Sequence, residues 1–174
     1  MKRPKAILLI AFSLLLSSLS GRTSFGFAAD YYLHSATTPD INLIPPTATT
    51  AKYKDSPAVN RTSYQQIGVW SAAPLATSVQ LQSLSNLVTW IGLKNSDDQG
   101  TYFDLKAEIL NNGSVIASGE TKDIQGVTRN ASLAKEVVLV FGAIAVTQFA
   151  AGDVLSLRVL ATVAGSGGAH HAAP

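Results

Sequence analysis

From Tyr64 onward, hydrophobic and polar residues follow the two-residue period of β-strands. The pattern is clearest in residues 101–110, where one face carries Phe103, Leu105, Ala107 and Ile109, and the other carries Tyr102, Asp104, Lys106 and Glu108. Successive side chains of a strand point to opposite faces of a sheet. This alternation therefore predicts a strand with one buried and one exposed face.

Other short runs with strand character stand between turn signals. They cover residues 65–70, 79–82, 87–94, 114–118, 136–141 and 155–162. Asn112-Gly113 predicts a type I′ hairpin turn, because both residues tolerate positive φ angles. The apolar run 136–141 is typical of a central strand. Roughly seven or eight strands with frequent turn signals predict an all-β fold, a β-sandwich or barrel over residues 64–163.

The segments on either side of this region are irregular. Residues 29–63 are predicted to form an extended N-terminal arm with short strand-like pieces at 31–34 and 41–44. Pro45-Pro46 ends the second piece, because proline lacks a backbone donor and restricts the residue before it. Residues 164–174 are of low complexity and predict a flexible tail.

Residues 1–28 have the form of a secretory signal peptide. Three cationic residues (Lys2, Arg3 and Lys5) precede an apolar run that is too short for a comfortable transmembrane helix. Small residues at Gly26 and Ala28 predict cleavage after Ala28, and Ser18-Leu19-Ser20 is a second candidate site. The alternative is an uncleaved N-terminal anchor. We expect a secreted protein, extracellular or on the cell surface, with no membrane contact after cleavage.

Composition restricts what the exported chain can bind. Hydrophobic residues make up 47% of the chain and charged residues 14%, which excludes a disordered protein. Four of the 13 cationic residues and none of the 11 acidic ones lie in residues 1–28, so the mature chain is slightly acidic. It has no basic run for nucleic acid. The chain contains no cysteine, which excludes disulfides and cysteine-ligated metals.

No catalytic residue is predicted, and we expect the protein not to be an enzyme. His34 could serve a Ser-His-Asp site only with a nucleophile on a sharp turn, and the sequence contains no G-x-S-x-G motif. Asp104 and Glu108 lie four residues apart on one strand face, which separates their backbones by about 13 Å, too far for a typical glycosidase pair. We interpret these carboxylates as a solvated strand face.

Two weaker binding sites are predicted. The turn at residues 95–100 matches an EF-hand loop at some positions, but Lys106 stands where that loop needs a glutamate. A looser Ca²⁺ site at Asp97 and Asp98 remains as a hypothesis, and no other cofactor is expected. Trp70 and Tyr102 are predicted as ligand-binding residues that stack on sugars, whereas Trp90 is assigned to the core.

Residues 70–162 resemble jelly-roll modules of exported microbial proteins. The motifs are W-S-x-x-P-L at Trp70–Leu75, F-x-L-x-A-x-I at Phe103–Ile109, the Asn112-Gly113 turn and A-G-D-x-L-x-L-R-V at Ala151–Val159. The chain is more distantly similar to the accessory jelly-roll domain of X-prolyl dipeptidyl peptidases. The resemblance implies that residues 64–163 form a jelly-roll-like antiparallel β-sandwich, preceded by the extended N-terminal arm, and that the module carries no catalytic residues.

Two functions follow from these observations. The first is a non-enzymatic structural or interaction protein of the cell exterior, a filament or surface-layer subunit that self-assembles by strand addition. An open sheet edge can accept an extended segment such as the N-terminal arm. Its partners would be copies of itself or other surface proteins. The alternative is a carbohydrate-binding module whose partners are glycans.

Overall fold

The computed structural model describes residues 6–18, 26–35, 39–44, 53–94 and 100–165 of the 174-residue chain. Within these residues the fold is all-β, as predicted, with one short 3₁₀ turn, η1 (Ala131–Leu133). The strands are β1 (Ala6–Ser18), β2 (Gly26–His34), β3 (Asp40–Asn42), β4 (Lys54–Asp55), β5 (Gln65–Ser71), β6 (Val79–Leu93), β7 (Phe103–Asn111), β8 (Ser114–Ile124), β9 (Lys135–Leu139), β10 (Thr147–Phe149) and β11 (Leu155–Val163). No described helix is long and apolar enough to span a bilayer.

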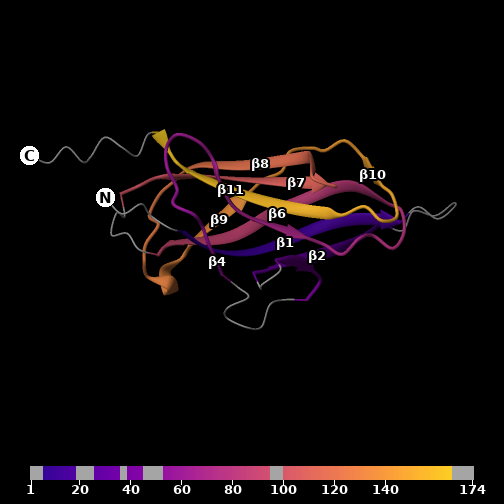
Figure 1. Cartoon of the computed structure of the whole chain (residues 1–174), viewed down its shortest axis with the longest axis horizontal. Helices are drawn as coiled ribbons and strands as arrows, with labels where there is room; N and C mark the ends of the chain where they lie inside the picture. Colours follow the sequence, from indigo (N-terminus) through magenta and orange to yellow (C-terminus); the bar gives the residue numbers. More distant parts are fainter. Residues whose placement is uncertain (1–5, 19–25, 36–38, 45–52, 95–99, 166–174) are drawn as a thin grey trace, which may run out of the picture.

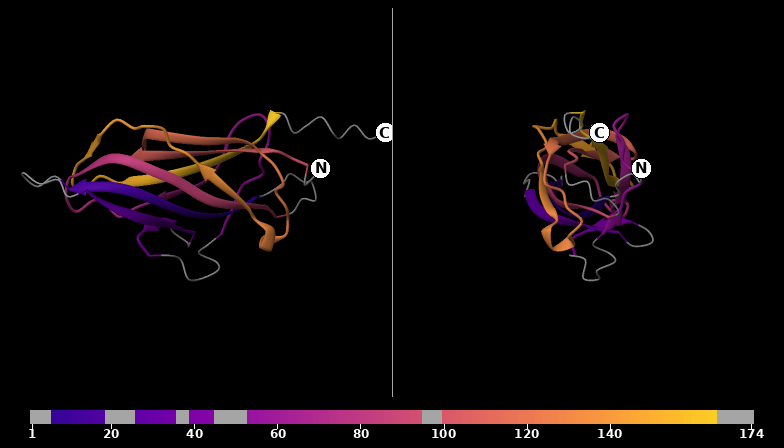
Figure 2. Two further views of the ribbon diagram at one scale, coloured as in Figure 1. Left: turned by 180° about the vertical axis from the view of Figure 1, so that it is seen from behind. Right: turned by 90° about the vertical axis from the view of Figure 1, so that its left-hand side faces the viewer.

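The strands form one strongly curled sheet in the order β10-β6-β1-β2-β3-β5-β11-β7-β8, and β4 and β9 pair with β1 and β6. All pairings between the described strands are antiparallel except the single contact between β3 and β5. The long strands run along the long axis of the molecule (Figure 1). An end-on view shows that they curl around a common interior (Figure 2). The result is a sandwich-like β fold.

The core lies between the two halves of this curled sheet. Its fully buried side chains come mainly from β6, β7 and β11, and include Leu81, Leu87, Leu105, Ile109 and Leu157. In β7 the odd-numbered residues 103–109 are buried, which confirms the predicted inward face, whereas Glu108 on the face predicted to be exposed is buried as well. The region predicted as an arm also contributes to the core, because Leu33, Ile41 and Val59 are each at most 3% exposed.

The β7–β8 hairpin turns at the predicted position. Asn112 and Gly113 have φ angles of 48° and 84°, as a type I′ turn requires. β8 also contacts the chain that follows β9. Gly119, in the middle of β8, forms an isolated antiparallel bridge with Phe141, just beyond β9.

Two strand predictions were wrong in detail. Residues 79–82 and 87–94 belong to the single strand β6, which contains irregularities in its pairing with β1 near Leu84. Residues 136–141 are not a central strand, because β9 pairs with β6 alone among the described strands. Its exposed positions Glu136, Val138 and Val140 show that one face meets solvent.

Candidate functional site

The most extensive strand pairing in the described part of the molecule involves residues 6–18, the apolar part of the predicted leader. They form β1, which pairs antiparallel with β6 from Ala6 opposite Leu93 to Ser18 opposite Val79. On its other edge β1 pairs with β2 and, near its start, with β4. In Figure 1 the indigo β1 lies between the magenta β6 and the purple β2. The predicted leader therefore occupies an interior position of the sheet.

The residues of β6 beside β1 are central to the core. Leu87, Thr89, Ile91 and Leu93 face inward and are each at most 2% exposed, and Leu81 is fully buried. One edge of β6 is partly covered by β10 and β9. Along the other edge, β1 alone among the described strands pairs with β6. This second edge is the candidate functional site, because any strand placed there completes both the hydrogen-bond ladder and the core wall.

This site was missed at the level of sequence for an identifiable reason. The sequence predicts two strands at residues 79–82 and 87–94, and the polar residues Ser83, Ser85 and Asn86 lie between them. No glycine or proline stands between residues 79 and 91, and this absence was the available signal for one long strand. The backbone keeps its pairing through the polar segment by means of β-bulges, which insert an extra residue without ending the strand.

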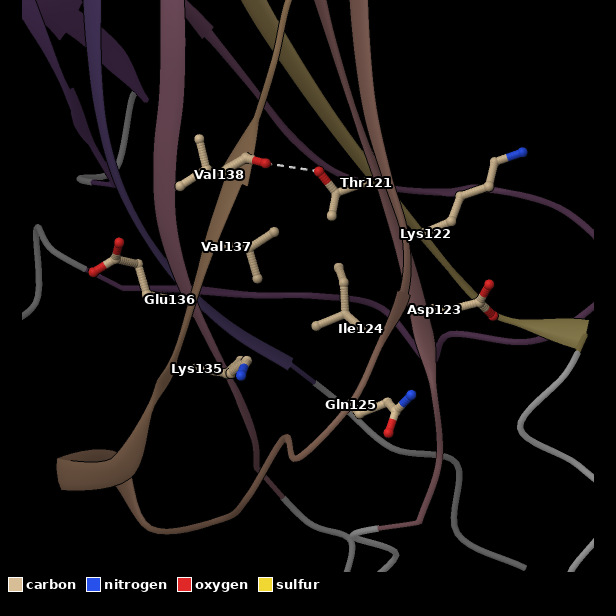
Figure 3. A pocket seen from close by; sticks show the side chains of 9 residues that line it. All are labelled: Thr121, Lys122, Asp123, Ile124, Gln125, Lys135, Glu136, Val137 and Val138. Carbon is tan, nitrogen blue, oxygen red and sulfur yellow. Dashed lines mark hydrogen bonds between the residues drawn. The ribbon is translucent and has the colours of Figure 1, made fainter.

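A second candidate is an open groove between β8 and β9, with a volume of about 310 Å³. Thr121 Oγ1 donates a hydrogen bond to the carbonyl oxygen of Val138 at 2.7 Å and closes one end. Figure 3 shows the apolar side chains of Ile124 and Val137 between the two strands, while Lys122 and Glu136 point away. The groove is open and these two charged side chains do not converge on it, whereas a small-molecule site is usually concave with a few polar groups directed at the ligand.

Of the two predicted sugar-stacking residues, only Tyr102 is accessible. Trp70 is 1% exposed and lies in the core, so its ring has no face available to a ligand in this structure. Trp90, which was assigned to the core, is only partly buried. The order of burial of the two tryptophans is therefore the reverse of the one that the sequence predicted.

A β-bulge in β5 accounts for the inward position of Trp70. In the pairing with β11, Gly68 stands opposite Val159 and Gln66 opposite Leu160, which leaves Ile67 as an extra residue. A bulge reverses the inward and outward alternation that follows it. Gly68 also leaves room for the indole, because a Cβ at this position would lie 2.8 Å from the Trp70 ring.

The predicted metal residues, Asp97 and Asp98, lie outside the described residues. Within the described part of the chain, no three His, Asp or Glu side chains gather as a metal site. The Ca²⁺ site stays a prediction.

The outward face of β7 carries a nearly buried carboxylate instead of the solvated one that was expected. The side chain of Glu108 is 8% exposed; its Oε2 accepts a hydrogen bond from Arg158 Nε at 2.6 Å and lies 2.5 Å from Arg158 Nη2. Lys106 Nζ lies 2.7 Å from the other carboxylate oxygen. Burial acts to raise the pKa of Glu108, but the hydrogen bonds and charges of Lys106 and Arg158 outweigh it and lower the pKa. A lowered pKa is the opposite of what a general acid needs.

A neighbouring polar contact joins Tyr64 to Glu120 of β8. The Tyr64 hydroxyl donates to the Glu120 carboxylate, and the pKa of Tyr64 is raised, first by burial and then by this bond. Lys122 Nζ lies 3.5 Å from the other Glu120 oxygen. Glu120 therefore contacts Tyr64 and Lys122, and we interpret these contacts as structural.

Known proteins give no further guide to the site. Comparison of the chain with protein-family models, with curated proteins and with solved structures finds no match. The resemblance to jelly-roll modules stays a prediction, and the geometry of the sheet is the remaining guide to function.

Proposed function

We propose that this protein is a secreted or cell-surface structural protein without enzymatic activity that assembles with copies of itself by strand addition. The observation that supports the proposal is the interior position of β1. If residues 1–28 are removed at export, β6 loses the strand that pairs along one of its edges and keeps β10 and β9 on the other, while the remainder of β2 keeps only its short pairing with β3. An uncovered sheet edge presents unpaired N–H and C=O groups that pair readily with another chain.

The exposed surface would also be apolar. Leu81, Leu87 and Ile91 are almost completely buried while β1 is in place. Removal of β1 takes away one wall of the core beside them. The mature chain would then have unpaired backbone groups along β6 and exposed hydrophobic side chains beside them. One added strand would pair with those backbone groups and cover those side chains.

The carbohydrate-binding alternative is less well supported, because Trp70 is buried and Tyr102 alone does not make a platform. Glycan-array measurements with the secreted protein and a Tyr102→Ala variant address it. Binding that depends on Tyr102 would favour this alternative over assembly.

The central experiment is to express the full chain in an exporting host and purify the secreted product. We expect electron microscopy by negative stain and light scattering to show filaments or other polymers. A matched variant that lacks residues 29–46 is expected to stay unassembled. A secreted chain that is monomeric at all concentrations would contradict the proposal.

A further inference from the structure

We propose that residues 6–18 hold the leader-bearing chain in a closed form, which is neither cleaved after Ala28 nor able to pair with a second copy along β6. Leader removal then has to precede folding of the chain around β1. The inference rests on the proposed function and adds how the candidate site along β6 is regulated.

The peptide bond that is predicted to be cleaved lies inside a paired strand. This bond, between Ala28 and Ala29, is within β2. In the ladder with β1, Ala28 stands opposite Leu15 and the next residue stands opposite Leu14. Proteases cut preferentially at exposed loop tips, and a bond in a ladder becomes accessible only when its strand opens. In the folded chain, β1 therefore protects this bond.

The pairing extends beyond the Ala28–Ala29 bond in both directions. The β1–β2 ladder begins at Gly26 and continues to Tyr32. β2 also pairs with β3 through residues 32–34. On its other edge β1 pairs with β6 from one end to the other, with two irregularities. A protease that binds its substrate as an extended segment has to separate β2 from β1 over several of these residues, so the open form is rarely populated.

The same strand covers the candidate site. Among the described strands, β1 alone pairs with this edge of β6, from Leu93 to Val79. While β1 is in place, Leu87 and Ile91 of β6 are at most 2% exposed. A second copy can add a strand only to an edge whose N–H and C=O groups are unpaired. Cleavage after Ala28 and strand addition at β6 therefore require the same event, the absence of β1 from the sheet.

The free edge at the other end of the sheet does not depend on the leader. β8 ends the strand order, and its described contacts are with β7 and with the chain around β9. None of these contacts involves β1, so we expect them to be the same with and without residues 1–28. A difference in assembly between the two forms therefore reports on the strands beside β1.

The order in which the chain folds and meets a signal peptidase tests the protection of the bond. The full chain, produced without export, is diluted from urea into buffer with purified peptidase, or is folded first and then given the peptidase. We expect the folded chain to be cleaved at least about tenfold more slowly, because cleavage follows the population of the open form. Equal rates in the two orders overturn the inference.

Mass spectrometry identifies the bond that is cut. The second candidate site, Ser18-Leu19-Ser20, ends outside the described residues. If the peptidase cuts the folded chain there as fast as the unfolded chain, β1 can leave after folding and the inference is overturned.

Ala11→Pro opens the closed form without changing the cleavage bond. Ala11 pairs with both Tyr32 and Val88, and proline lacks the N–H donor that a strand between two neighbours needs. We expect this variant to be cut after folding nearly as fast as before folding. Ala11→Gly keeps the N–H and is the matched control, which should stay protected. Cleavage rates before folding show whether either change alters recognition by the peptidase, and an Ala11→Pro chain as protected as the parent contradicts the role of β1.

Light scattering compares assembly of the folded full chain and of the secreted product at equal concentration. We expect the secreted product to polymerise and the leader-bearing chain to stay unassembled. A peptide of residues 1–18, added to the secreted product, should slow polymerisation because it can pair with β6 again. The same peptide with Ala11→Pro is the control and should have no effect. Equal effects of the two peptides, or none, overturn the regulation at β6.

The outcomes separate this inference from the proposed function. A folded full chain that polymerises as fast as the secreted product overturns the inference and leaves self-assembly standing. A secreted product that stays monomeric removes the proposed function and the regulation of assembly with it. In that case the cleavage rates still decide whether folding around β1 protects the bond after Ala28.

Discussion

Asn112 and Asp153, which are 41 residues apart in the chain, join two turns at one end of the sandwich. Asn112 Nδ2 donates a hydrogen bond to Asp153 Oδ1 at 2.7 Å. The backbone N–H of Val154 donates to Asn112 Oδ1 at 2.9 Å, and the N–H of Asn112 donates to the Val154 carbonyl at 3.0 Å. The β7–β8 hairpin is thereby fixed to the turn that precedes β11.

Replacing Asn112 with glycine removes these side-chain bonds and leaves the turn intact. Glycine adopts the φ angle of 48° at no steric cost, so any loss reflects the missing amide. The lost bond to the Val154 N–H alone costs about 1 kcal/mol. We expect Asn112→Gly to lower the midpoint of thermal unfolding by a few degrees, as measured by circular dichroism.

Asn112→Asp is the informative comparison. It keeps an acceptor for Val154 but places a second carboxylate beside Asp153. We expect Asn112→Asp to destabilise the protein more than Asn112→Gly at neutral pH. The difference in stability between the two variants should become smaller at acidic pH, as the carboxylates are protonated. Equal stability of the two variants at pH 7 would contradict this account of the turn.

Acid stability depends in part on the same aspartate. The backbone N–H of Ala150 and then the Asn112 amide hold the pKa of Asp153 below its ordinary value of 3.8. Because the folded pKa is the lower one, the stabilisation is fully present above the unfolded pKa and is lost as pH falls through the folded pKa. We expect Asp153→Asn to be less stable than the parent near pH 6, with the difference shrinking below about pH 4. A constant difference in denaturant midpoints across that range would argue against this linkage.

The Glu108 cluster should contribute more to stability than the surface pairs of β8. Arg158→Met removes a hydrogen bond and an ion pair from a carboxylate that is 8% exposed, and leaves it with Lys106 alone. Bonds to buried charges are worth about 1.5–3 kcal/mol, and the partly exposed arginine places the loss toward the lower end, about 2 kcal/mol. Urea unfolding at pH 7 measures it.

Lys122→Met is the matched control, because Lys122 is 65% exposed and its Glu120 contact is 3.5 Å long. Exposed ion pairs contribute little, so its effect should stay below about 0.5 kcal/mol. Similar losses in the two variants would mean that Glu108 is better solvated than the structure indicates.

Sequence patterning predicted best the features that have a local signal. The position of β7, its buried odd-numbered residues and the Asn112-Gly113 turn were predicted correctly, because a period of two and a positive-φ dipeptide are local signals. The burial of Glu108 on the opposite face was not predicted, because it depends on the pairing of β7 with Arg158 of β11.

The burial of Trp70 could not be predicted in this way, because it depends on a bulge at Ile67 that is fixed by the pairing of β5 with β11, far along the chain. Trp90, by contrast, alternates with the buried residues Thr89 and Ile91, so its partly exposed position follows a local pattern. The candidate site along β6 was not predicted for a related reason, because it is defined by the strand that pairs with that edge of β6.

Gly119 allows β8 to approach the chain beyond β9. A Cβ at this position would lie 2.7 Å from the carbonyl oxygen of Val140, which is backbone and cannot rotate away. Gly119→Ala should therefore force the two segments apart and cost about 1–3 kcal/mol, as overpacking does. Gly142→Ala is the control, because nothing lies within 4 Å of the added methyl group and its φ angle is not positive. If Gly119→Ala is as stable as Gly142→Ala in urea unfolding, the Gly119–Phe141 bridge is not a tight contact.

Trp70 tests the revised placement of the two tryptophans. Its ring is buried, but Nε1 has no hydrogen-bond partner in the described part of the chain. Trp70→Ala should cost about 3–5 kcal/mol through loss of packing. Trp70→Phe should cost less than about 2 kcal/mol, because it keeps much of the ring and removes an unpaired buried donor. Trp90→Ala, at a partly buried position, should be milder than Trp70→Ala. Denaturant unfolding of the three variants measures how much stability each one loses. If Trp90→Ala lost more stability than Trp70→Ala, the core position that the sequence predicted for Trp90 would be restored.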